Sequence, residues 1–246
     1  MWRASPPRPA AVRLLRRARE RFDLYPLAIH VNYLINLASR DPLIRRRSIA
    51  AFRRELQRAA AIGAEFLVLH PGSYRNQSLE SALAALEAGL REATGSLPGG
   101  VTILLENTAG AGCQIGSRFE ELRAIREQVL AGSGLSLGYC LDTCHLLAAG
   151  FDIATSGGLG ATLRRAEAVL GLSNVRLIHA NDSKGALGSR LDRHAHIGAG
   201  QIGADGFRRI LRHPKLRRKP FVLETPVDEP GDDRRNLDTL KSLALG

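Results

Sequence analysis

The segment Val101-Thr102-Ile103-Leu104-Leu105-Glu106 joins a short apolar run to a carboxylate, and this combination recurs along the chain. Before it, His70 follows Phe66-Leu67-Val68-Leu69, and His30 follows Leu27-Ala28-Ile29. After it, Asp142, His179 and Glu224 each follow a comparable run. The successive intervals are 40, 36, 36, 37 and 45 residues, which is about the length of one strand–helix unit. The spacing therefore predicts six parallel strands joined by helical crossovers.

Because parallel strands point the same way, the residues that follow them gather on one rim, where β/α barrels carry their active sites. A chain of 246 residues is long enough for one such unit. We therefore predict a single α/β domain over residues 1–246, a TIM-type (β/α) barrel. A closed barrel needs eight strands, and no convincing strand precedes Leu27, so we expect an N-terminally truncated barrel with six evident strands.

Helix signals lie between the expected strands. Asp41-Pro42 predicts a helix that begins at Pro42 and ends at about Ile62, before Gly63. Other helices are expected at about 78–94, after a Ser117/Glu120 capping box, at about 160–170, at 206–211 and at 234–245. The segment from Arg8 to Phe22 predicts a surface helix whose Val12, Leu15 and Phe22 face inward.

The composition is strongly basic, with a net charge of +11 and a sequence pI of about 10.5. This balance favours polyanionic partners, nucleic acid first. A coding bias, indicated by the dominance of Ala, Gly, Leu and Arg, would account for part of it, and each basic cluster taken alone is typical of a solvated helix face. Three cysteines form no disulfide framework, which is typical of a reducing cytoplasm. The chain has no 18-residue apolar run and no evident signal peptide, so we expect a cytoplasmic protein without a membrane anchor.

Three more residues of metal-ligand type accompany the six at the strand ends. His145 lies three residues after Asp142, and Asp192-Arg193-His194 forms a D-x-H pair. Imidazole and carboxylate ligands without thiolate suit Zn²⁺, Mn²⁺ or Fe²⁺. Nine ligands are too many for one ion, so they predict a multinuclear hydrolytic site, for which a phosphodiester is the natural substrate. The nine candidates are His30, His70, Glu106, Asp142, His145, His179, Asp192, His194 and Glu224.

These residues lie in blocks that closely resemble endonuclease IV, the metal-dependent AP endonuclease family of base-excision repair. The blocks include His30-Val31-Asn32-Tyr33-Leu34-Ile35-Asn36, His70-Pro71-Gly72-Ser73, Leu105-Glu106-Asn107-Thr108, Leu141-Asp142-Thr143-Cys144-His145, His179-Ala180-Asn181-Asp182-Ser183-Lys184, Leu191-Asp192-Arg193-His194 and Leu223-Glu224-Thr225. They occur in the family's order from about residue 2 to Glu224. A series of this length is far more specific than any single short motif.

The resemblance implies a β/α barrel with three zinc ions, for which manganese is an alternative. It implies that His30, His70 and Glu106 hold the first ion. Glu106 would bridge to a second ion, held also by Asp142, His179 and Glu224, and the third would be held by His145, Asp192 and His194. The implied reaction is hydrolysis of double-stranded DNA 5′ to an abasic site, which leaves a 3′-hydroxyl and a 5′-deoxyribose phosphate.

The same resemblance implies roles for individual side chains. Glu106 and Glu224 would be the catalytic carboxylates, with Glu224 as the candidate base. Tyr33 and Leu34 would enter the DNA at the lesion, and Arg193 would contact a phosphate. For Tyr33 taken alone, an aromatic residue of the core or rim would be the ordinary interpretation.

The chain departs from the family at its start, where the first strand, a helix and the second strand are missing. We expect that the true start lies upstream, and that the protein is a monomer unless the open barrel edge pairs with another chain. Two other interpretations stay open. One is an inactive or weak truncated paralogue that binds DNA or zinc, and the other is a sugar isomerase or epimerase of the related barrel superfamily.

Overall fold

The structure is a computed structural model that describes residues 5–95, 100–131 and 135–245. Within these residues, six strands form one sheet in the order β1-β2-β3-β4-β5-β8. They are β1 (Ala28–His30), β2 (Phe66–Leu69), β3 (Thr102–Glu106), β4 (Leu137–Asp142), β5 (Val175–His179) and β8 (Phe221–Val222). The pairs β1–β2, β2–β3, β4–β5 and β5–β8 are parallel. All six predicted strands are therefore confirmed, and the described residues before β1 contain no strand.

The helices alternate with the strands, as the intervals predict. They are α1 (Pro9–Phe22), α2 (Pro42–Ile62), α3 (Leu79–Thr94), α4 (Phe119–Leu130), α5 (Thr143–Ala148), α6 (Ser156–Leu170), α7 (Gly203–Arg212) and α8 (Asp232–Leu245). A 3₁₀ turn, η1 (Leu172–Asn174), precedes β5. A short antiparallel pair, β6 (Asp182–Ser183) with β7 (His194–Ala195), was not expected. No described helix is both long and apolar enough to span a membrane.

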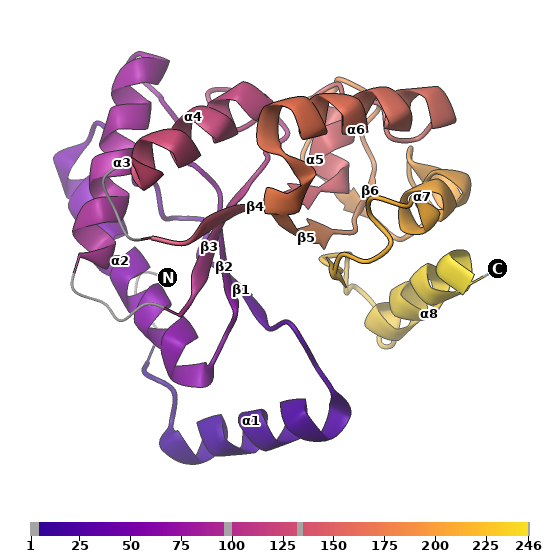
Figure 1. Ribbon diagram of the computed structural model, residues 1–246, viewed down its shortest axis with the longest axis horizontal. Coiled ribbons are helices and arrows are strands. Elements are labelled where there is room, and N and C mark those ends of the chain that lie inside the picture. The colour runs from indigo at the N-terminus through magenta and orange to yellow at the C-terminus, as the bar shows by residue number, and fades with distance from the viewer. Residues whose placement is uncertain (1–4, 96–99, 132–134, 246) are drawn as a thin grey trace. The chain divides into compact units, whose positions relative to one another are not determined.

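The chain divides into two compact units. Of the described residues, the first unit contains 5–95, 100–105, 124–131 and 135–138, and the second contains 106–123 and 139–245. In the first unit, α2 and α3 lie side by side and β1, β2 and β3 run next to one another (Figure 1). In the second unit, α7 packs on α6 and α8, and α5 packs against β6. The single-domain expectation stays a prediction.

The register of the paired strands places the candidate ligands at the same height in the sheet. Leu69 of β2 pairs with Leu105 of β3, so His70 and Glu106 each follow one residue of this pair. In the second unit, Asp142 pairs with His179, and His179 pairs with Val222, two residues before Glu224. Side chains at these levels leave the strands at their carboxyl ends, as the sequence predicts.

Two helix expectations had different outcomes. The limits of α2 are confirmed: the side chain of Asp41 caps the amides of Leu43 and Ile44, and Gly63 adopts φ 75° at the other end. The inward face predicted for α1 is wrong for Leu15 and Phe22, while Val12 is half-buried. Leu15 and Phe22 are 36% and 61% exposed, and the buried residue of α1 is Arg19, because its guanidinium pairs with Glu65 at 2.7 Å.

The Ser117/Glu120 capping box is also wrong in its detail. Glu120 pairs with Arg165 of α6, while the neighbouring Glu121 accepts a hydrogen bond from the amide of Gly116 at 2.7 Å. The carboxylate that satisfies an amide before α4 therefore lies one residue further along the chain. Sequence spacing alone does not distinguish two adjacent glutamates at a helix start.

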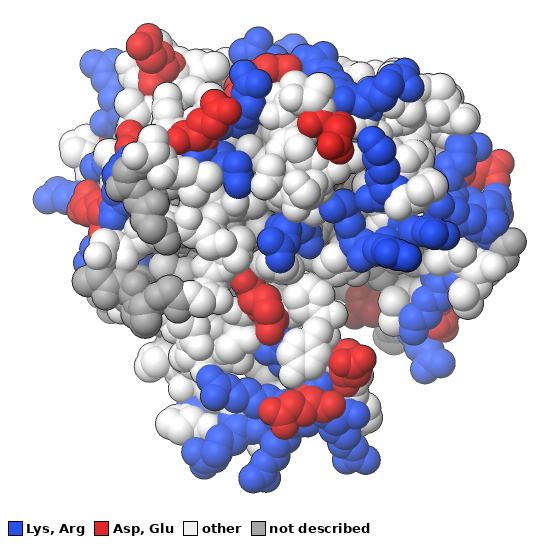
Figure 2. Space-filling model, in the orientation of Figure 1, with Lys and Arg blue, Asp and Glu red and all other residues white. Residues whose placement is uncertain are grey.

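Basic side chains cover separate parts of the surface. Figure 2 shows Lys and Arg side chains along α1 and, in the second unit, over α7. Several of them make local ion pairs, such as Arg208 with Asp205. Such exposed pairs contribute little stability, so these arginines are mainly solvated charge.

Candidate metal centre

Two histidines converge at the carboxyl ends of the first unit's strands. His30 is the last residue of β1, and His70 directly follows β2. Their ring centroids lie 5.0 Å apart with the planes at 87°. Nδ1 of His30 lies 2.7 Å from the carbonyl oxygen of Val31, which selects the tautomer whose Nε2 can bind a cation.

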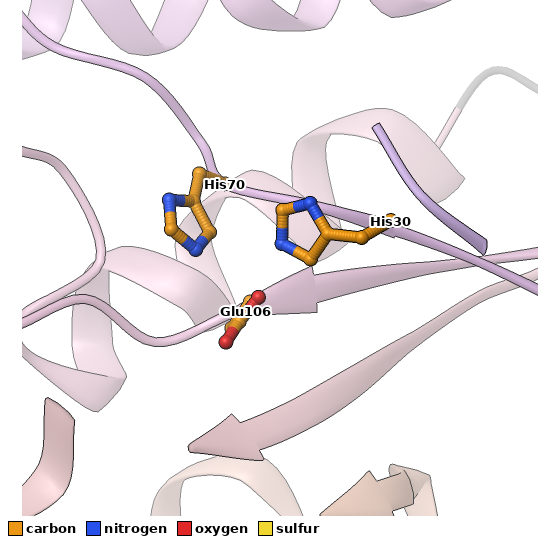
Figure 3. Close-up of side chains that lie close together, drawn as sticks. All are labelled: His30, His70 and Glu106. Carbon is orange, nitrogen blue, oxygen red and sulfur yellow. The ribbon is translucent and has the colours of Figure 1, made fainter. Parts of the chain in front are cut away.

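Glu106 is the last residue of β3 and is fully buried. Ligand atoms of His30, His70 and Glu106 lie within 4.8 Å of one another, and Figure 3 shows the three side chains at the ends of their strands. We call this set the His30 group. Two imidazoles and one carboxylate are ligands that a divalent transition metal accepts.

The His179 group consists of Glu106, Asp142, His179 and Glu224, whose ligand atoms also lie within 4.8 Å of one another. Nδ1 of His179 lies 2.9 Å from Oε1 of Glu106 and 3.0 Å from Oε2 of Glu224. Three carboxylates thus surround one imidazole. In a buried setting this excess of negative charge is stable only when cations or protons neutralise it.

The His145 group consists of His145, Asp192 and His194. Oδ1 of Asp192 lies 3.2 Å from Nε2 of His145 and 3.5 Å from Nε2 of His194. Local structure sets each member in place. Asp142 caps α5 by accepting the amide of His145 at 2.7 Å, which turns His145 back over the strand ends. His194 lies in β7, which pairs with β6.

Hydrogen bonds orient both imidazoles of this group. Nδ1 of His145 lies 2.9 Å from the carbonyl oxygen of Asn107, and Nδ1 of His194 lies 2.9 Å from that of Glu224. Each ring therefore donates from Nδ1 and presents Nε2 to the group. Within the described part of the chain, Nε2 of His194 is buried and makes no hydrogen bond. An acceptor nitrogen held beside a carboxylate in this way fits a cation.

The pKa values of the buried histidines are raised by the same excess of negative charge from the carboxylates. Burial alone would lower the pKa of His145, but the carboxylates of Asp142, Asp192 and Glu106 outweigh it and raise that pKa to about 10. Burial likewise opposes the charged form of His179, yet the carboxylate of Glu106 raises its pKa far above the ordinary range. Each imidazole lies in a field that favours positive charge, whether a proton or a metal ion supplies it.

The structure thus brings the nine predicted ligands into three groups, and two further sets of close ligand-type atoms include a cysteine: Cys140 with Glu106 and His179, and Cys144 with Asp142 and His194. Cys140 and Cys144 lie beside them and are buried, and burial raises the pKa of each thiol to about 12. A thiol with so high a pKa remains protonated near neutral pH, so nitrogen and oxygen donors dominate the site.

The residues predicted to contact DNA lie on the surface. Tyr33 is 84% exposed on a turn in which the amide of Ile35 donates to the carbonyl of Asn32 at 3.0 Å. Leu34 is half-buried on the same turn. Arg193 is exposed between Asp192 and His194, and its guanidinium donates to the carbonyl of Asp192 at 2.8 Å. Their contacts with DNA stay a prediction.

Two asparagines that support the ligands, Asn107 and Asn181, were not predicted from the sequence. Asn107 pairs with the backbone of Asp142, accepting its amide at 2.7 Å and donating to its carbonyl at 3.2 Å. Asn181 donates to Oδ2 of Asp142 at 2.5 Å and accepts the amide of Glu224 at 2.8 Å. The available signal was their position, one and two residues after ligands at strand ends.

Asp182 holds the loop that follows the β6–β7 pair. Its buried carboxylate accepts the amides of Gly198, Gly200, Ile202 and Gly203 at 2.9–3.2 Å. A Cβ on Gly200 would lie 2.5 Å from Oδ1 of Asp182, so glycine permits this close approach. The loop is therefore built around one carboxylate.

The fold and the site define a β/α protein of TIM-barrel class with metal-ligand groups at its strand ends. Comparison with known proteins agrees. The family described as a xylose isomerase-like TIM barrel matches residues 1–243. A probable endonuclease 4 from Solibacter usitatus is 68% identical over 245 residues, which cover 99% of this chain and 84% of the relative. One from Chloroflexus aurantiacus is 40% identical, with 100% and 86% covered.

A solved structure gives the same answer in three dimensions. The crystal structure of endonuclease IV from Thermus thermophilus superimposes with a TM-score of 0.84 at 37% identity, with 99% of this chain and 84% of that chain covered. The chain belongs to the endonuclease IV family. This membership favours the nuclease over the sugar isomerase among the interpretations left open by the sequence.

Proposed function

We propose that this protein is a metal-dependent endonuclease that incises double-stranded DNA 5′ to abasic sites in base-excision repair. Membership of the endonuclease IV family supports the nuclease activity. The dependence on metal is supported by the convergence of nine imidazole and carboxylate side chains into three ligand groups. The products would be a 3′-hydroxyl and a 5′-deoxyribose phosphate.

The donor set fits three divalent ions, zinc first and manganese as an alternative. The His30 group would hold one ion, the His179 group a second and the His145 group a third. Glu106, which belongs to the first two groups, would bridge them. Bound divalent ions would neutralise phosphate oxygens and make water a stronger nucleophile at neutral pH.

The side chains of this chain would supply the remaining chemistry. Glu224 would take a proton from the attacking water, whose oxygen forms a new bond to phosphorus as the bond from phosphorus to O3′ breaks. The leaving O3′ oxygen would take up a proton from solvent and become the 3′-hydroxyl. Its Oε2 lies 3.0 Å from Nδ1 of His179, so the carboxylate is already directed into the group. Glu106 would serve mainly as a ligand, because it is fully buried among imidazoles.

Recognition of the lesion would come from surface loops. Tyr33 is a large side chain, 84% exposed at the tip of a turn, and such an exposed ring can stack on bases. Leu34 beside it supplies an apolar wedge of the kind that unstacks base steps. Arg193 presents a guanidinium next to two candidate ligands, where a phosphate oxygen would be its natural partner.

We further propose that the protein acts in the cytoplasm as a monomer.

Incision of a labelled duplex with one abasic site tests the proposal. With zinc or manganese, the protein should cut 5′ to the lesion, and prolonged chelation should abolish cutting. Asp192→Ala removes the carboxylate between His145 and His194, so it should reduce incision by about 100-fold or more. Asp228→Ala, at an exposed carboxylate outside the three groups, is the matched control and should cut as the parent does.

Each possible result is informative. Absence of cutting by the parent protein at any metal loading would contradict the proposed activity. Cutting that persists in chelator would contradict the role of the ligand groups. Equal activity of Asp192→Ala and Asp228→Ala would show that the His145 group takes no part.

A further inference from the structure

A polar pocket of about 530 Å³ opens in the first unit, between two loops that follow candidate metal ligands. One wall belongs to the segment after Tyr33, and the other belongs to the segment after His70. The polar residues that line it include Asn36, Arg40, Asp41, Ser73, Arg75 and Asn76. None of these residues belongs to the three ligand groups.

Two arginines give the pocket its charge. Arg40 and Arg75 are exposed, and in the part of the chain that the structure describes neither forms an ion pair with a carboxylate. Nη1 of Arg40 donates to the carbonyl of Asn76 at 3.0 Å, which joins the two walls. The remaining N–H groups of Arg40 and the whole guanidinium of Arg75 are available to a ligand.

The walls are held in place before any ligand arrives. Oδ1 of Asn36 accepts the amides of Ala38 and Ser73 at 3.1 and 3.3 Å, and Nδ2 donates to Oγ of Ser73 at 3.2 Å. Gly72 adopts φ 99°, and a Cβ there would lie 2.3 Å from Oδ1 of Asn36. A single amide side chain thus fastens one loop to the other, so binding requires little ordering.

The one carboxylate in the lining does not cancel the arginines. Oδ1 of Asp41 accepts the amides of Leu43 and Ile44 at 2.8 and 3.0 Å, so the carboxylate caps the N-terminus of α2. The partial positive charge of that terminus opposes it. Two unpaired guanidiniums, hydroxyls and an amide therefore face the pocket, a set that suits the tetrahedral oxygens of a phosphate.

We propose that this pocket binds a backbone phosphate of DNA, at a phosphodiester other than the one that is cut. The inference rests on the proposed function, because it assigns the ligand to the same nucleic acid. A phosphate contact carries no information about the base or the lesion. The pocket therefore contributes affinity and orientation, equally for damaged and undamaged duplex.

The test is the salt dependence of binding. Affinity for an abasic duplex with a non-hydrolysable linkage at the cut site, and for the matched undamaged duplex, would be measured with the zinc-loaded protein at several salt concentrations. Arg40→Gln and Arg75→Gln should each weaken both affinities about tenfold. Each should also make the slope of log K against log salt shallower by about one, as expected for one lost phosphate contact.

Two controls distinguish the loss of a phosphate contact from a general loss of charge or of folding. Arg164→Gln removes an exposed, unpaired guanidinium of α6 and is the matched charge control, for which we expect less than a twofold change. Arg75 makes no hydrogen bond within the described residues, so its variant should fold as the parent does even if Arg40→Gln disturbs the walls. Thermal unfolding of each variant checks this.

The outcomes separate this inference from the proposed function. Unchanged affinity in both pocket variants, an equal loss in Arg164→Gln, or a loss confined to the abasic duplex would overturn the phosphate pocket. A parent protein that binds duplex through these arginines but never incises it would overturn the proposed function and leave the pocket standing.

Discussion

At the residue scale, Asn181 has an unusual concentration of contacts with the ligands of one group. It is fully buried, and its Nδ2 lies 2.5 Å from Oδ2 of Asp142 and 3.5 Å from Oε2 of Glu224. Its own amide donates to the hydroxyl of Thr143 at 2.8 Å, which holds the backbone in place. One side chain therefore orients two carboxylates of the His179 group.

Replacement of the Asn181 side chain should weaken metal binding more than it lowers the stability of the fold. Asn181→Ala removes the donor to Asp142 and the acceptor for the amide of Glu224, and loss of such supporting contacts weakens metal binding by about 10–100-fold. Competition with a chromophoric chelator measures the affinity. Asn174→Ala is the control, because it deletes a part-buried amide that donates to the carbonyl of Leu170 outside the ligand groups. Equal metal affinity in the two variants would contradict the assigned role.

At the element scale, Glu65 fastens two segments to the start of β2. Its carboxylate pairs with Arg19 of α1 at 2.7 Å and accepts the amide of Leu27, just before β1, at 2.6 Å. Burial opposes the charged form, but these partners prevail and hold the pKa of Glu65 below its ordinary value of 4.5. This carboxylate explains why an arginine is the buried residue of α1.

The depressed pKa gives a pH dependence with a definite sign. Because the folded pKa lies below the unfolded one, the stabilisation is fully present above about pH 4.5 and is lost as pH falls through the folded value. Glu65→Gln should therefore be less stable than the parent at neutral pH, and the difference should shrink in acid. Urea unfolding between about pH 3 and pH 7 measures it. Glu20→Gln, at an exposed glutamate of α1, should show no such trend, and a constant deficit for Glu65→Gln would contradict the ion pair.

At the scale of the whole molecule, the ligand groups make the stability of the fold depend on metal binding. In chelator, protonated His145 and His179 would balance the buried carboxylates. Their folded pKa values lie above the ordinary 6.5, so this stabilisation is complete below about pH 6.5 and is lost as pH rises, through about 10 for His145. Metal ions replace those protons, so the stabilisation by zinc should grow with pH.

Thermal unfolding with zinc and with chelator, at about pH 6 and about pH 9, tests this coupling. The metal-free protein should melt lower at the higher pH, and the gain from zinc should be larger there. A gain from zinc that is the same at both pH values would contradict the exchange of metal for protons. The experiment needs no DNA, so it remains informative if the protein does not cut.

Several elements could be predicted because their signals are local. The limits of α2 follow from Asp41, Pro42 and Gly63, each of which acts on the backbone within a few residues of its own position. The strands follow from short apolar runs of three to five residues. The inward face of α1 could not be predicted, because it depends on Glu65, a partner 46 residues away that pairs with Arg19.

The sequence by itself determined the alternation of strands and helices, and it placed a ligand-type residue at the carboxyl end of each strand. Both follow from short-range patterns and from the common direction of parallel strands. Only the tertiary structure decided which ligands share a group, that Asn181 supports them, that Asp182 holds the loop after β7, and that Arg40 and Arg75 line one pocket. Those facts depend on side chains that are distant along the chain and meet only after the strands pair and the loops close over them.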